Sequence, residues 1–277
     1  IDNIPINEVT HAHGQGYTDL NFLIPEMMGT IDYTKGPFNA AIGDFGVAGS
    51  DRIHLIKDMP TMISGSVDTF GNERLVTGGT AHFHNGDKLV GAFETDHADG
   101  PWKYPDNFRA IKSIARYLHG NGTNGFDLTG MYYRGQWRAT NDQPLPAVQQ
   151  KLIGPYGSLD PTDGGFTERY SLSGHYRFGD DRQKWVTSFY VDHSRLSLWN
   201  NFTHFLIDPA NGDQFQQDET RTKIGGTQSY TRSDMLFSSV PTETTFGIDG
   251  RYDTIYIDRR HTSQRVVLST CPDSPFG

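Results

Sequence analysis

The stretch THAHGQGYTDLNFLIPEMMGTIDYTKGPFNAAIGDFGVAGS, residues Thr10–Ser50, decides how this chain folds. It begins with a loop rich in glycine, histidine and aromatic residues, and it continues into a short amphipathic turn at residues 24–26. A strand that ends at residues 35–37 follows, and then a second glycine-rich loop. Beyond this stretch the sequence changes to regular apolar–polar alternation, so the two parts of the chain predict different kinds of structure.

The alternation begins near Ile63 and continues in segments of about 8–14 residues. In Arg169–Phe178 the even positions carry Tyr, Leu, Gly and Phe, whereas the odd positions carry Arg, Ser and His. This period of two is typical of a sheet that has one apolar and one wet face. It predicts nine strands, which begin near residues 63, 74, 88, 110, 126, 166, 184, 222 and 244.

The connections between these strands alternate in length. Asn85-Gly86-Asp87, Asn121-Gly122-Thr123 and Asp180-Asp181 predict tight hairpin turns, and a fourth short link contains residues 240–242. Between them lie long polar loops at residues 99–109, 138–165 and 204–221. Outer-membrane β-barrels alternate in this way, because their periplasmic turns are short and their extracellular loops are long. The link at residues 71–73 is an exception, since it is short at an outer position.

Composition excludes several classes of protein. The formal charge of −9 and the sequence pI of about 5.6 argue against nucleic acid as a partner, since phosphate binding needs a basic face. One cysteine, Cys271, can form neither an internal disulfide nor a thiolate metal cage. No apolar run approaches the roughly 18 residues of a membrane-spanning helix, which leaves membrane β-barrels possible.

A spanning barrel must have no open edge, because unpaired backbone groups in hydrocarbon cost several kcal/mol each. Nine strands are an odd number, and a barrel of about that size has no room for a folded insert. We therefore expect this chain to be a piece of a larger protein, in which the strands form part of a wall.

Residues 1–58 resemble the C-terminal half of the plug domain of TonB-dependent outer-membrane receptors. The residues that carry this resemblance are Asp2, Ile4-Pro5-Ile6-Asn7, Ile24-Pro25-Glu26, Lys35-Gly36-Pro37 and Gly43…Ala48-Gly49-Ser50, with His11–Tyr17 matching a subgroup whose plug loop reads like His-x-His-Gly-Gln-Gly-Tyr. Asn3 departs from the family's usual glycine, and residues 51–54 are more charged than the usual strand.

The resemblance implies a mainly β protein: a partial transmembrane antiparallel β-barrel of about nine strands with part of an α/β plug. Residues 1–58 would belong to the plug and residues 59–277 to the barrel. The implied function is active uptake of a scarce solute, such as a ferric siderophore, a cobalamin or a metal complex, and not an enzymatic activity. The implied partners are the small-molecule ligand, outer-membrane lipid and the energy-transducing TonB complex, reached through a segment missing here. No cofactor is implied.

The plug loop and one outer loop supply the candidate ligand contacts: His11, His13, Gln15 and Tyr17, and Trp102 and Tyr104. Alternate histidines on an extended segment point to one face, and imidazole is a common metal ligand. No third ligand lies at a suitable spacing, so we expect no metal site. These residues are either exposed polar residues of a loop or direct contacts with the ligand, and both interpretations remain open.

The acids on the predicted inner face indicate a hydrated lumen, although paired carboxylates can also serve glycoside hydrolysis. These acids are Glu94, Asp96, Asp127, Asp192 and Asp249. No Gly-x-Ser-x-Gly or His-Glu-x-x-His motif is present. Two alternatives to the receptor remain, namely a passive porin-like channel and a soluble secreted β-rich binding protein.

Overall fold

The computed structural model describes residues 1–2, 4–11, 14–43, 46–237 and 239–268. In these residues the chain forms twelve strands, one short α-helix and two 3₁₀-helices. They are η1 (Pro25–Met27), β1 (Met28–Lys35), η2 (Ala40–Ile42), β2 (Gly49–Leu55), β3 (Met62–Val67), β4 (Glu73–His82), β5 (Lys88–Ala98), β6 (Phe108–Gly120), β7 (Gly125–Arg138), α1 (Leu145–Gln149), β8 (Gly164–Gly179), β9 (Gln183–Asn200), β10 (Phe215–Leu236), β11 (Val240–Ser263) and β12 (Val266–Val267). Asn3, His13 and Cys271 lie outside the described residues.

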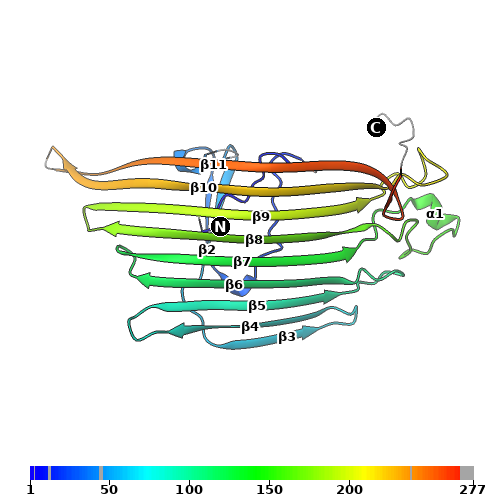
Figure 1. Cartoon of the computed structure of the whole chain (residues 1–277), viewed down its shortest axis with the longest axis horizontal. Helices are drawn as coiled ribbons and strands as arrows, with labels where there is room; N and C mark the ends of the chain where they lie inside the picture. The colour runs from blue at the N-terminus through cyan, green and yellow to red at the C-terminus, as the bar shows by residue number, and fades with distance from the viewer. Residues whose placement is uncertain (3, 12–13, 44–45, 238, 269–277) are drawn as a thin grey trace.

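Strands β3–β12 form one antiparallel sheet, which we call the wall (Figure 1). Each strand pairs with its neighbours in the sequence, so the order across the sheet is the order along the chain. The nine predicted strands are all present, and β12 adds two residues to β11. The sheet is unclosed, with β3 at one edge and β11–β12 at the other.

The alternation of short and long connections is confirmed. Long loops at residues 99–107, 139–163 and 201–214 lie at one end of the wall, and the short turns after β4, β6 and β8 lie at the other end (Figure 1). The turn between β3 and β4 is short and lies at the end of the long loops, which is the predicted exception. The loop before β10 is shorter than predicted, because β10 begins at Phe215 and not near residue 222. Residues 216–221 are polar on both faces, so no apolar alternation marked the start of this strand.

The last short link was also placed wrongly. Residues 240–242 belong to β11, where Pro241 pairs with Met235, and the turn lies before them. Proline lacks an N–H and is tolerated in a strand whose other side is not paired. β11 satisfies this condition, because beyond it β12 pairs only with Thr262 and Ser263.

The two faces of the wall have the reverse of the usual arrangement in a soluble protein. Apolar side chains such as Tyr176 (55% exposed) and Ile248 (72%) lie on the exposed face, as the alternation predicts. Polar side chains such as Ser173 (2%) and Asp192 (0%) lie on the opposite face and are buried. The polar face is therefore the one that the rest of the chain covers.

The amino-terminal segment, residues 1–58, covers this polar face near the middle of the strands (Figure 1). β1 and β2 pair with each other and form a separate two-stranded sheet. The chain turns directly after β1 at Gly36, whose φ is +74°, a conformation that glycine adopts without steric cost. One apolar cluster joins the segment to the wall and includes Phe22, Ile24, Met27, Ile53 and Leu55 with Val76, Val90 and Ile114 of the wall.

None of the helices in the described part of the chain has the length and apolarity needed to cross a membrane.

Candidate functional site

The candidate site is the interface between the amino-terminal segment and the polar face of the wall. Three carboxylates of the segment, Asp2, Glu8 and Glu26, enter ion pairs with cationic side chains of the wall. Each forms its own centre, at a different group of strands. In every centre the segment supplies one acid. The wall supplies the cations and also further acids.

The first centre lies on β4–β6. Arg74 donates two hydrogen bonds to the Glu26 carboxylate, at 2.8 Å and 2.7 Å, in the fork geometry that strengthens such pairs. Arg74 also lies 2.5 Å from Glu94, which is 1% exposed and also pairs with Lys112. The hydrogen bonds from Arg74 hold the pKa of Glu26 below its usual value, so Glu26 stays charged at neutral pH.

The second centre lies on β6–β8 and is buried more deeply. Arg116 of the wall contacts the Asp2 carboxylate at 2.5 Å and Asp127 at 3.3 Å. Asp127 in turn contacts His175 and Arg177, each at 2.7 Å. One guanidinium thus joins the segment to a charge network that belongs to the wall.

The third centre lies on β9–β11 and has Glu8 at its middle. The Glu8 carboxylate lies 2.8 Å from Lys223, 3.2 Å from Arg221 and 3.3 Å from Arg251. The Arg221 and Lys223 side chains are fully buried. Arg251 also donates a hydrogen bond to the carbonyl of Asn7, at 2.9 Å, which fixes the backbone beside Glu8.

Wall acids balance the cations of this third centre. Arg221 pairs with Glu219 at 2.9 Å and with Asp253 at 3.0 Å. Lys223 pairs with Asp192 at 3.2 Å. Buried charges are costly unless each has a partner, and these contacts provide one for every cation.

These contacts correct the predicted hydrated lumen. Glu94, Asp127 and Asp192 are buried in ion pairs beneath the amino-terminal segment, and only Asp249 remains exposed on its strand. The alternation identified the inner face correctly but carried no information on what covers it. The third centre could not be located from the sequence, because Arg221 fell in the predicted loop at residues 204–221 and a cation needs a nearby carboxylate only when it is buried.

The predicted ligand loop lies against β10. His11 stacks on Tyr17, with ring centroids 4.0 Å apart and planes 8° from parallel. The His11 Nε2 lies 3.6 Å from Glu219, and its side chain is 6% exposed, so His11 is packed against the wall and is not an exposed loop residue. Gln15 is exposed and Tyr17 is 36% exposed, whereas His13 lies outside the described residues.

Trp102 and Tyr104 lie in the loop between β5 and β6. The Trp102 indole donates a hydrogen bond to Asp106 at 2.9 Å, and its ring lies 6.2 Å from Tyr156 of the next long loop. Tyr104 is 37% exposed. Among the described residues, no hydrogen bond or ring contact joins this loop to His11 or Tyr17.

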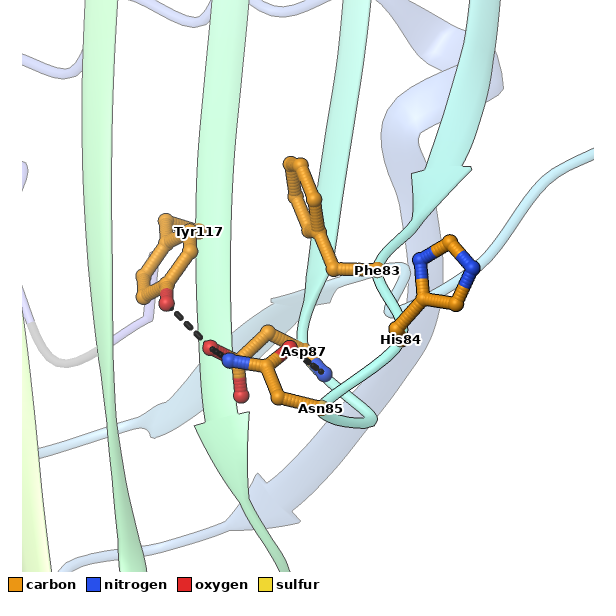
Figure 2. Close-up of a pocket in the computed structure, with 5 residues that line it drawn as sticks. All are labelled: Phe83, His84, Asn85, Asp87 and Tyr117. Carbon is orange, nitrogen blue, oxygen red and sulfur yellow. Dashed lines mark hydrogen bonds between the residues drawn. The ribbon is translucent and has the colours of Figure 1, made fainter.

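A hollow at the short-turn end of the wall is lined by Phe83, His84, Asn85, Asp87 and Tyr117 (Figure 2). The Tyr117 hydroxyl and the Asn85 amide both donate hydrogen bonds to Asp87, which holds the β4–β5 turn against β6. In the described part of the chain, no three His, Cys, Asp or Glu side chains gather in a way that would hold a metal ion.

No family model and no curated protein sequence matches this chain. Among solved structures, the unliganded ferric citrate transporter FecA matches with a TM-score of 0.59 over 80% of this chain, at 14% sequence identity. The chain spans about a third of that protein, 34% of its length. The likeness confirms the mainly β fold predicted from the strand pattern: the chain forms an unclosed antiparallel sheet with the fold of part of the barrel of FecA, a TonB-dependent transporter.

Proposed function

We propose that this chain is part of a TonB-dependent outer-membrane transporter that takes up a scarce solute, with residues 1–58 in its plug and residues 59–277 in its barrel wall. The observation that carries the proposal is the wall's reversed polarity. An apolar outer face suits lipid, and a polar inner face bound to a folded segment by buried ion pairs suits a plugged barrel. The FecA-like fold supports the same proposal.

A plug held by ion pairs can be displaced when a ligand and an energy source both act on it. A ligand shifts such an equilibrium only through its different affinities for the two plug states. The proposed solute is a metal chelate, such as a ferric siderophore, with cobalamin as another member of the class. The proposed partner for energy coupling is the TonB complex.

The test is uptake of radiolabelled ferric chelates by cells that carry the full-length gene, with and without TonB. We expect accumulation against a gradient that stops when TonB is removed. A passive porin-like channel would instead equilibrate the solute at the same rate in both strains. A protein recovered from the soluble periplasmic fraction would contradict both membrane functions.

Tyr17, which is 36% exposed in the predicted ligand loop, gives a sharper test of ligand contact. Replacing Tyr17 by Ala is expected to raise the KM for uptake about tenfold, since a lost aromatic contact is worth about 1 kcal/mol or slightly more. The matched control is Leu20→Ala, because Leu20 is also exposed (45%) in the same segment. If the KM is the same in the two variants and the wild type, at equal receptor levels, Tyr17 does not contact the ligand.

A further inference from the structure

Four arginines gather on the exposed, apolar face of the wall, close to the long loops. They are exposed and come from three strands: Arg109 of β6, Arg134 and Arg138 of β7, and Arg195 of β9. The strand register places Arg134 and Arg195 in one row, on either side of Glu168 of β8. The chain as a whole has a formal charge of −9, so this local excess of cations is contrary to its composition.

Phe166 of β8 contacts both arginines of this row. The Cζ of Arg134 lies over the Phe166 ring, 5.1 Å from its centroid, and the Cζ of Arg195 lies 6.0 Å from the same centroid. Such a contact uses the flat face of a guanidinium and leaves the N–H groups in its plane free to donate. Two like charges at one ring repel each other, so an anion that both guanidiniums bind would stabilise the arrangement.

The acids on this part of the face are engaged with neutral groups. Glu168 accepts a hydrogen bond from the Tyr132 hydroxyl at 3.0 Å. Asp218 of β10 accepts hydrogen bonds from neutral side chains of β9 and β10. Within the described part of the chain, neither carboxylate forms an ion pair with Arg134 or Arg195. The two arginines therefore keep donors available for an anion from outside the chain.

The arginine row lies directly beyond the apolar side chains of the exposed face. In β8 these side chains are Phe178, Tyr176, Leu172 and Tyr170, and Glu168 is the next residue on the same face. From Phe178 to Glu168 is about 33 Å along the strand, or about 25 Å of height at a tilt of about 40°. The apolar band of membrane barrels has about this height, so the arginines would lie at the level of the lipid headgroups.

We propose that Arg134 and Arg195 bind a phosphate group of a lipid headgroup, while the acyl chains of the same lipid lie on the apolar side chains of the wall. Guanidinium forks match the oxygens of a phosphate, and the exposed Arg109 and Arg138 add positive charge around the site. Long loops are extracellular in barrels of this kind, so the lipid belongs to the outer leaflet. This inference rests on the membrane location proposed above.

The test is binding of lipid A, a glycolipid with two phosphates, by the purified full-length protein in a neutral detergent, measured by native mass spectrometry. Lipid A without its phosphates and inorganic phosphate are titrated in parallel. We expect Arg134→Gln/Arg195→Gln to weaken binding of lipid A at least tenfold, since each basic side chain near an anionic lipid contributes about fivefold. The matched control is Arg232→Gln, which removes an exposed arginine near the short-turn end of β10 and should bind like the wild type.

Heat-modifiable mobility of each variant shows that the barrel has assembled. Equal affinity of the wild type and the double variant for lipid A overturns the inference, and so does equal affinity of the wild type for lipid A and its form without phosphates. Binding of inorganic phosphate as tight as that of lipid A overturns the assignment to a lipid and indicates a soluble anion. If phosphate-dependent lipid binding is found without TonB-dependent uptake, the inference stands and only the proposed transport is overturned.

Discussion

Arg221→Met is expected to be the most destabilising single change at the interface between the amino-terminal segment and the wall. The substitution keeps an unbranched side chain of similar length but removes a fully buried charge that contacts Glu8, Glu219 and Asp253. Removing one partner of a buried ion pair typically costs about 3–5 kcal/mol, because the remaining charges stay buried without compensation. Arg221 also donates a hydrogen bond to the carbonyl of Thr10, so the backbone of the plug loop loses a contact as well.

The effect is measured in the purified full-length protein by the temperature at which the amino-terminal segment, residues 1–58, becomes sensitive to protease. Arg232→Met is the matched control, since it lies on the same strand and pairs with Asp234 while both side chains are more than half exposed. Exposed pairs contribute about 0–1 kcal/mol, so the control should behave like the wild type. If this temperature shifts by the same amount in both variants, the buried centre has no special role in holding the amino-terminal segment on the wall.

Ile248→Lys is expected to impair assembly of the wall. Ile248 lies near the middle of β11 and is 72% exposed on the apolar face. A lysine on the lipid side of a barrel costs about 2–4 kcal/mol near the bilayer midplane. Thr245→Lys is the control, because Thr245 is an exposed residue on the opposite face of the same strand.

Assembly is measured as the fraction of heat-modifiable protein in the outer-membrane fraction. We expect a clear loss for Ile248→Lys and a normal level for Thr245→Lys. Similar losses in both variants would contradict the assignment of the two faces. Ser173 is unsuitable as a control although it faces inward, because it is 2% exposed and a charge there would be buried.

The strands could be predicted from the sequence because the wall has one apolar and one polar face, which is the simplest pattern a sheet can show. Apolar residues at every second position located the strands and assigned side chains to the two faces of the sheet. Turn residues such as Asn121-Gly122 located the hairpins. The prediction failed where that pattern stops. β10 begins seven residues before the predicted start, since residues 216–221 are polar on both sides of the strand.

The interface between the amino-terminal segment and the wall could not be predicted in the same way. Asp2 and Arg116 are 114 residues apart, and Glu8 and Lys223 are 215 residues apart. Alternation assigns a side chain to a face but does not identify the element that covers that face. The motif at residues 1–7 indicated a plug, whereas the role of Asp2 and Glu8 as its attachment points required the three-dimensional arrangement.

Each wall cation that contacts Asp2, Glu8 or Glu26 of the amino-terminal segment also contacts an acid of the wall. Arg74 has Glu94, Arg116 has Asp127 and Lys223 has Asp192, and all three of these acids belong to the wall. In the transporter proposed above, withdrawal of the amino-terminal segment would return Asp2, Glu8 and Glu26 to water, while each wall cation would keep its acid partner in the wall. The polar face uncovered in this way would present paired charges to the solute, and the segment could return to the same contacts.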